Sequence, residues 1–282
     1  MKRYFAVFAL MLLAPLAVSA QEVKQTNGTD APISIVPFTV EPVPFGPGEL
    51  MNYRARWGIF GTVGNGSLEV ESVDTVRGEP AYKLAFRMKG KVVAWGMDDV
   101  QRSWLDVDNL FAHRFEQKLN QTSYKRDRTL DFLTDEMRWV RQGKEEENGE
   151  LATDAPLDDV SFLYFVRTLP LEPGETYTLP RYYKDEGNPV TLKVLRREKI
   201  KVPAGEFETV VVRPIIKTRG MFGEDGEAEV WFTDDAERIL VKLQAKMGAG
   251  PFGGTLKLEL ENFTPGTRLV SAPRSESLYG GK

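Results

Sequence analysis

Apolar and polar residues alternate with a period of two over long parts of the chain, and this pattern predicts β-strands that each bury one face. The alternation is clearest in residues 82–89, 239–247 and 256–261. Shorter runs predict further strands at residues 68–70, 190–194, 207–216 and 228–232. Turn-forming residues separate these runs at hairpin distances. We expect an antiparallel meander, because a parallel sheet would need crossover helices between its strands.

Residues 155–169 break this pattern and predict one helix. Pro156 lies in its first turn, Asp158 and Asp159 place carboxylates beside the positive end of the helix, and Pro170 ends it. The centre of the helix is apolar on nearly all sides, so the helix is expected to be enclosed. The expected fold is all-β and mainly antiparallel, with a large curled sheet or half-barrel wrapped around one central helix.

The two halves of the chain resemble each other around Trp104 and Trp231. Residues 104–109, which lead into a strand at 112–118, align with residues 231–236, which lead into a strand at 240–244. A degenerate duplication, with the helix as the connector, explains this similarity. Chance likeness between two β-hairpins is the alternative explanation.

The ends of the chain differ from its body. Lys2 and Arg3 precede an apolar run and a small-residue site at Ala20, which predicts a secretory signal peptide over residues 1–20. The run is shorter than the roughly 20 apolar residues of a membrane-spanning helix. A periplasmic or secreted protein without a transmembrane segment is therefore expected after cleavage near Ala20. We expect an extended proline-rich arm at 21–47, one β-rich domain at 48–263 and a disordered tail at 264–282.

Composition excludes several kinds of chemistry. The 282 residues include no cysteine, which rules out disulfides, thiol nucleophiles and thiolate metal sites. His113 is the single histidine, so a histidine-rich zinc site cannot form, and we expect no metal and no cofactor. The formal net charge of −4 makes nucleic acid an unexpected partner. The most basic run, residues 124–128, is interpreted as a solvated strand face.

Adjacent carboxylates are the remaining catalytic candidates. Two carboxyl groups at a suitable separation would suffice for glycoside hydrolysis, which makes Asp234 and Asp235 candidates for an acid or a base. Their setting is typical of a hairpin turn in which Asp side chains bond their own backbone. Asp158 and Asp159 are explained by the start of the helix. We therefore expect no enzymatic activity and keep a carboxylate-dependent hydrolase of envelope glycans as the alternative.

Aromatic side chains are plentiful, with five Trp, sixteen Phe and nine Tyr. Most of them are expected to form the core. A curled sheet of this size must either fill its concave side or leave space there for an apolar ligand. The expected ligand-binding residues are Trp95, Trp104, Phe162, Phe165, Phe222 and Trp231.

Several motifs in order resemble an exported bacterial family, the domain of unknown function 3108. They are the runs 156–170, 202–207 and 230–235, and an opening at 45–50 followed by Tyr53 and Trp57. The resemblance covers about residues 45–263. It implies a mostly β exported domain and no activity. More loosely, the expected architecture resembles that of the lipoprotein carriers of the bacterial envelope.

Three functions follow as hypotheses. The first is a non-enzymatic envelope protein that binds an apolar small molecule, a lipid or a hydrophobic segment of a partner on the concave face. The second is the glycan hydrolase. The third is a scaffold whose edge strands or proline-rich arm engage another envelope protein.

Overall fold

A single large sheet dominates the structure, a computed structural model that describes residues 43–216, 228–247 and 254–269. Within these ranges fourteen strands pair, and every neighbouring pair is antiparallel. The expected all-β, mainly antiparallel class is thus confirmed. The expected signal peptide, most of the arm and most of the tail lie outside the described residues.

Eight strands precede the helix. They are β1 (Leu50–Trp57), β2 (Thr62–Val76), β3 (Glu79–Val92), β4 (Trp95–Asp106), β5 (Ala112–Gln121), β6 (Tyr124–Leu133), β7 (Arg138–Arg141) and β8 (Lys144–Glu150). Six strands follow it. They are β9 (Thr176–Leu179), β10 (Val190–Val202), β11 (Gly205–Ile215), β12 (Glu229–Thr233), β13 (Leu240–Met247) and β14 (Gly254–Thr264). Single 3-10 turns occur at Gly58–Phe60, Thr134–Glu136 and Asp185–Gly187.

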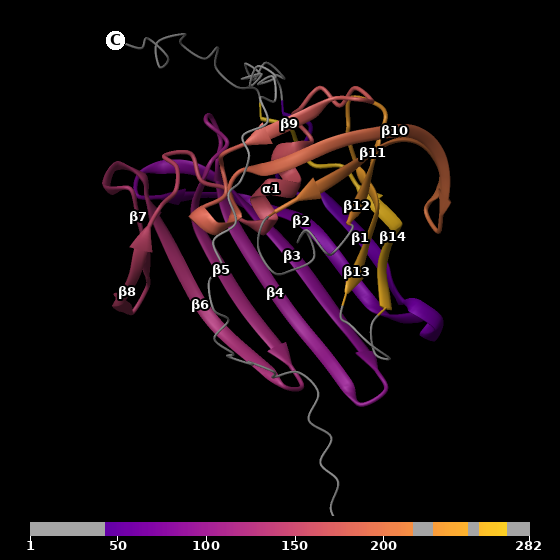
Figure 1. Cartoon of the computed structure of the whole chain (residues 1–282), viewed down its shortest axis with the longest axis horizontal. Coiled ribbons are helices and arrows are strands. Elements are labelled where there is room, and N and C mark those ends of the chain that lie inside the picture. The colour runs from indigo at the N-terminus through magenta and orange to yellow at the C-terminus, as the bar shows by residue number, and fades with distance from the viewer. Residues whose placement is uncertain (1–42, 217–227, 248–253, 270–282) are drawn as a thin grey trace, which may run out of the picture. The chain divides into compact units, whose positions relative to one another are not determined.

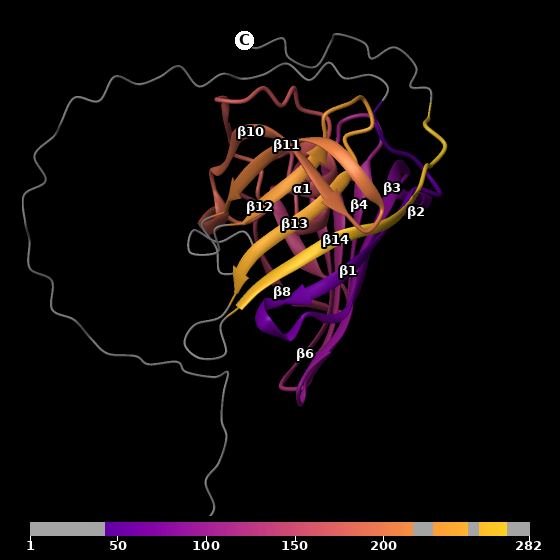
Figure 2. The same ribbon diagram turned by 90° about the vertical axis from the view of Figure 1, so that its right-hand side faces the viewer.

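Strand order joins the beginning and the end of the domain. The sheet runs from β8 back through the sequence to β1, then continues with β14 and returns to β9. Strand β1 therefore pairs with β2 on one side and with β14 on the other. Strands β8 and β9 are the two free edges, so the sheet is not closed. It wraps around the helix α1 (Asp159–Val166), as the two views in Figures 1 and 2 show.

Helix α1 confirms the expected central helix but is shorter than expected. It begins after the N-cap residue Asp158, whose side chain accepts hydrogen bonds from the backbone of Val160 and Ser161. The three residues before Asp158 are not helical because Leu157 forms a β-bridge with Tyr182. Seven of the eight helical residues are buried, which agrees with an apolar sequence on all sides.

The face of the sheet that packs against α1 is filled with side chains. We call it the inner face and the opposite one the outer face. Leu84, Leu105 and Phe115 lie on the inner face and form one buried cluster with the helix residues Phe162 and Phe165. Near the C-terminus of α1, the gap between the helix and the sheet is too small for a water molecule. At this end of the helix, the described residues therefore leave no cavity for a ligand.

Residues 43–47 differ from the expected extended arm. Val43 and Phe45 are almost fully buried in the core cluster. Phe45 packs edge-on against Tyr82 and Tyr164, at 5.3 and 5.1 Å between ring centroids. The end of the arm thus forms part of the domain, because two apolar side chains are removed from water there.

Glycines allow β2 and β3 to approach closely. Gly64 pairs with Gly90, and a Cβ atom on Gly64 would lie 2.1 Å from the carbonyl oxygen of Lys89. We expect Gly64→Ala to lower the free energy of unfolding by about 1–3 kcal/mol, because the backbone must shift to admit the methyl group. Urea unfolding measures this. The control is Gly96→Ala, whose Cβ would meet nothing closer than 3.7 Å; an equal loss in both variants would contradict the prediction.

The two halves of the sheet pair in a matching manner around their tryptophans. Between β4 and β5 the register shifts immediately after Trp104, and between β12 and β13 it shifts immediately after Trp231. In each half a residue with positive φ, Leu110 or Arg238, lies two positions before the return strand. This agreement supports the two-half arrangement that the sequence suggests.

Candidate functional site

Both tryptophans of the repeated corners lie on the outer face, not on the expected concave face. The indole nitrogen of Trp104 donates to Asp74 at 3.1 Å, and that of Trp231 donates to Glu198 at 2.5 Å. A cation covers each ring, since Lys242 Nζ lies 4.0 Å from the Trp231 centroid and Arg114 lies 5.5 Å from that of Trp104. The two tryptophans therefore stabilise the outer face and do not line a ligand site there.

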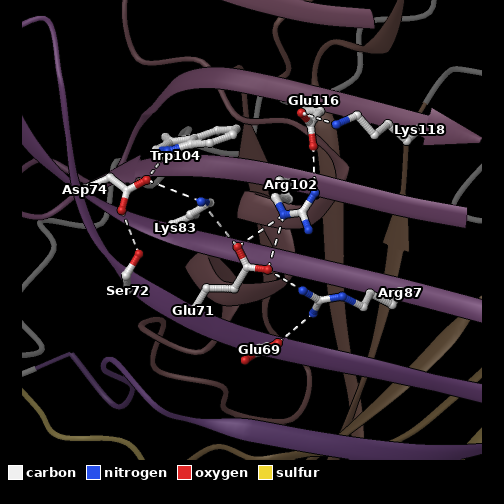
Figure 3. Close-up of polar contacts among 10 residues, drawn as sticks. All are labelled: Glu69, Glu71, Ser72, Asp74, Lys83, Arg87, Arg102, Trp104, Glu116 and Lys118. Carbon is white, nitrogen blue, oxygen red and sulfur yellow. Dashed lines mark hydrogen bonds and ion pairs between the residues drawn. The ribbon is translucent and has the colours of Figure 1, made fainter. Parts of the chain in front are cut away.

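Charged side chains around Trp104 form a compensated network, drawn in Figure 3. Glu71 contacts both Arg87 and Arg102, and Arg102 also donates to Glu116 at 2.7 Å. The hydrogen bond from Ser72 lowers the pKa of Asp74, with a further contribution from Trp104, so this carboxylate stays ionised at neutral pH. Because each charge in the network has an opposite partner, the network offers no free charge to a ligand.

The other residues that were expected to bind a ligand do not lie together either. Phe162 and Phe165 are buried in the core, at 2% and 0% exposure, and no ligand can reach them without unfolding the domain. Trp95 lies at the start of β4 and is 38% exposed. Phe222 lies outside the described residues. The structure thus does not bring the predicted site residues together on one surface.

The side chains on the inner face of β3 to β6 are more exposed beyond α1 than beside it. Ser103 donates to the N-cap Asp158 at 2.6 Å, and the inner side chains from Ser103 toward Leu105 are buried beside the helix. In the other direction, toward the β3–β4 hairpin, the strands continue past α1 and most inner side chains are half-exposed (Figure 1). The helix does not cover this part of the inner face.

We call this region the open patch. It consists of Phe86 on β3, Met97 and Gln101 on β4, Gln117 and Leu119 on β5, and Arg126 and Arg128 on β6. Uninterrupted pairing places these residues in adjacent rows on the same face as Ser103. The open patch has the apolar side chains Phe86, Met97 and Leu119, two glutamines at its centre and two arginines on β6, and of these side chains only Gln117 is buried.

Asp99 lies within the open patch, on the inner face of β4 between Met97 and Gln101, and its hydrogen bonds are internal. Its Oδ1 accepts from the backbone N–H of Asn120 at 2.9 Å, and its Oδ2 accepts from the side chain of Gln121 at 2.6 Å. Both oxygens therefore hold β4 and β5 together. Asp99 is 6% exposed and both of its oxygens accept hydrogen bonds, so it offers no free base at the surface.

The acidic pairs proposed for hydrolysis have structural partners. Asp234 binds Arg197 at 2.6 Å and Arg238 at 3.1 Å, and these bonds lower the pKa of Asp234 despite partial burial, which acts to raise it. Asp235 accepts from the backbone N–H groups of Glu237 and Arg238, as expected for a turn. The contacts thus agree with the predicted turn role for Asp235, while Asp234 is paired with two arginines.

His113 has a structural environment as well. Its Nε2 lies 2.9 Å from Asp106 Oδ2, its ring packs edge-on against Phe111, and it is 5% exposed. Among the described residues, no group of three or more His, Asp or Glu side chains is arranged to hold a metal ion. No helix in the described ranges has both the length and the apolar character needed to cross a membrane.

Comparison with known proteins identifies the family and no relative of known function. A family described as a protein of unknown function, DUF3108, matches residues 52–260. No curated protein matches the chain. Among solved structures, a β-barrel-like protein of the family DUF1849 from Brucella abortus shares 9% identity, covers 77% of this chain and 97% of its own, and has a TM-score of 0.48.

Two further solved structures have lower similarity. A candidate lipoprotein from Parabacteroides distasonis shares 11% identity over 79% of this chain and 98% of its own, with a TM-score of 0.34. A candidate exported protein with a YmcC-like fold from Bacteroides fragilis shares 11% identity over 78% and 97%, with a TM-score of 0.27. Because all three TM-scores are below 0.5, these likenesses do not bear on function.

Proposed function

The chain belongs to the DUF3108 family, whose description assigns no activity, and we propose that it is an exported envelope protein that binds rather than catalyses. The ligand is an amphiphile whose acyl chain lies on the open patch. The proposed location is the periplasm or the exterior, after removal of residues 1–20. The proposal rests on the contrast between two parts of one face: buried side chains beside α1, and half-exposed apolar side chains beyond it.

The apolar part of the open patch has the chemistry that an acyl chain requires. Phe86, Met97 and Leu119 face the same side of three consecutive strands and each keeps part of its surface in water. Covering such surface contributes roughly 25 cal/mol for each Å² removed from water. Trp95 and Val93, 38% and 78% exposed, extend the apolar surface to the β3–β4 hairpin. Together with Met97 and Leu119, these two residues give an acyl chain apolar contacts that reach the edge of the domain.

The filled interior defines how the ligand is held. Because the core beside α1 is filled with side chains, the acyl chain lies on the sheet and is covered on one side only. This mode predicts moderate affinity and rapid exchange, since a ligand covered on one side gains less than one enclosed in a pocket. It differs from the enclosed carrier that the sequence suggested around Phe162 and Phe165.

The scaffold alternative receives less support from the free edges. Strand β8 exposes Glu145, Glu146 and Glu147, and a row of like charges disfavours the addition of another strand. Strand β9, at the other edge, has only four residues. The proline-rich arm lies mostly outside the described residues, so its role in binding a partner stays a prediction.

We expect Met97→Asn combined with Leu119→Asn to weaken binding of a fluorescent fatty acid about tenfold, because the variant removes apolar contact from the centre of the open patch. A fluorescence titration of the purified protein measures this. Leu133→Asn is the matched control, since Leu133 is a half-buried leucine whose position after the inward-facing Phe132 places it on the outer face of β6. Equal affinities for the wild type and both variants, or no binding to the wild type, would contradict the proposal.

A further inference from the structure

Two arginines of the open patch have no acidic partner. In residues 43–216, 228–247 and 254–269, fourteen arginines form ion pairs with Asp or Glu side chains. Arg181 donates to the backbone carbonyls of Ala155 and Leu110. Only Arg126 and Arg128 in these ranges have neither an ion pair nor a backbone carbonyl acceptor.

A buried amide orients the two guanidinium groups. Gln117 Oε1 accepts from Arg128 Nε at 2.8 Å and lies 3.4 Å from Arg126 Nη1. Gln117 is 7% exposed and donates in turn to Gln101 at 3.2 Å, so its position is fixed within the sheet. The guanidinium group of Arg126 also lies 5.3 Å from the ring of Tyr124. Two cations are thus directed to the same place by neutral groups.

The acidic groups nearby do not neutralise this pair. Asp127 lies between the two arginines on β6, and strand alternation places it on the outer face. Asp99 is occupied by Asn120 and Gln121, as described above. The charge of Arg128 acts on Asp159, but that carboxylate accepts from the Tyr182 hydroxyl and forms no ion pair with the arginine. Neither arginine is therefore neutralised by a direct ion pair.

Two half-buried guanidinium groups side by side repel each other, and each loses part of its hydration. An anion bound between them would offset both costs. Each guanidinium has five N–H donors, of which one is used by Gln117, so most donors of the pair remain available. The planar fork of arginine matches the oxygens of phosphate in a bidentate manner. A phosphate group with two negative charges fits a site with two such forks.

We propose that Arg126 and Arg128 bind the phosphate of an amphiphile whose acyl chain lies on the apolar part of the open patch. This inference rests on the proposed function and assigns its ligand class. Leu119 pairs directly with Arg126. Phe86 and Arg128 share the neighbouring row, in which they are three strands apart. With roughly 4.8 Å between strands, Leu119 lies about 5 Å from Arg126 and Phe86 about 14 Å from Arg128, beyond Gln117 and Gln101, and an acyl chain is long enough to reach both apolar side chains.

The test compares two ligands that differ only in the phosphate. A lysophosphatidic acid and a monoacylglycerol with the same acyl chain are titrated into the full mature chain, the double variant Arg126→Gln/Arg128→Gln and the control Arg54→Gln/Arg56→Gln. The control removes the same charge from outward-facing arginines that pair with Glu261 and Glu259. We expect the wild type and the control to prefer the phosphate lipid by about tenfold or more, because only this lipid can form charge-assisted hydrogen bonds with the two guanidinium groups.

The double variant should lose this preference and keep the affinity for the monoacylglycerol. Its unfolding midpoint should be no lower than that of the wild type, because the change removes a like-charge contact. If the double variant retains the preference, the inference is wrong while the proposed function stands. If neither lipid binds the wild type, the proposed function fails along with the lipid ligand.

Inorganic phosphate is the third ligand of the test, and it separates a lipid headgroup from a free ion. We expect phosphate alone to bind the wild type at least tenfold more weakly than the phosphate lipid, because it lacks the acyl contacts. Equal affinities of the two would overturn the assignment to an amphiphile. Binding of phosphate that is unchanged in the double variant would overturn the assignment to Arg126 and Arg128.

Discussion

Replacing Glu49 by glutamine is expected to lower the free energy of unfolding by about 3–5 kcal/mol, one of the two largest single effects that we predict for this domain. The carboxylate of Glu49 receives two hydrogen bonds from Arg167, at 2.6 and 2.9 Å, and both side chains are 2% exposed. The neutral amide of the Glu49→Gln variant would leave the guanidinium group buried without a counter-charge. Urea unfolding monitored by tryptophan fluorescence measures the loss.

The position of this ion pair explains why the loss should be global. Arg167 follows α1 and also donates to the backbone carbonyls of Pro44 and Glu237, so it joins the helix to the segment before β1 and to the β12–β13 turn. The expected outcome is a lower unfolding midpoint with an unchanged slope, because the whole sheet unfolds together.

A surface ion pair and a paired replacement provide the controls. Glu261→Gln breaks the contact of Glu261 with Arg54, whose side chains are 35% and 42% exposed, and should cost less than about 1 kcal/mol. The double variant Glu49→Leu/Arg167→Met should regain part of the loss, since it buries no lone charge, though two carbonyls lose their donor. Equal losses for Glu49→Gln and Glu261→Gln would contradict the prediction.

Local patterns in the sequence were sufficient for the class of fold. Period-two alternation identifies strands such as β3, β13 and β14 because each buries one face, and the apolar run around Leu163 identifies the enclosed helix. The pairing of β1 with β14 was beyond this reasoning, because it joins segments at opposite ends of the domain. The start of α1 was misplaced because the bridge of Leu157 with Tyr182 is a tertiary contact that competes with the helix.

The face to which a side chain points was the main error at the candidate site. Trp104 and Trp231 precede the buried Leu105 and Phe232, so alternation places them outside, and cations cover their rings there. Counting aromatic residues cannot detect this, since a tryptophan is amphipathic enough for either face. Following the alternation back from the buried Leu130 would have placed Arg126 and Arg128 on the inner face, against the interpretation as a solvated strand face.

Stability should fall as the pH rises from about 4 to 8, and Asp158 should be a principal cause. Burial raises the pKa of Asp158 to about 7, although Ser103 and the backbone N–H groups of Ser161 and Val160 all donate to it. In the unfolded chain this carboxyl has its ordinary pKa of about 3.9. Between these values the folded state holds a proton that the unfolded state has lost, so stability decreases with rising pH.

The difference of about three pKa units corresponds to about 4 kcal/mol, which is fully lost above pH 7. Asp158→Asn keeps an oxygen for the two backbone donors but cannot ionise. The free energy of unfolding of the variant should therefore depend less on pH than that of the wild type. Between pH 4 and pH 8, the difference between these two free energies should change by about 4 kcal/mol in favour of the variant. Guanidinium unfolding at a series of pH values measures both curves.

Other carboxylates also titrate, so a control variant is needed to assign the pH dependence to Asp158. Burial also raises the pKa of Asp159, and this shift acts in the same direction in the wild type and in the variant. Asp234→Asn serves as the control, because the pKa of Asp234 is lowered and its contribution is lost only as the pH falls below the usual range of an Asp. Parallel curves for the wild type and Asp158→Asn across pH 4 to 8 would mean that Asp158 is ionised in the fold, held by its three donors, and would refute this account of the helix N-terminus.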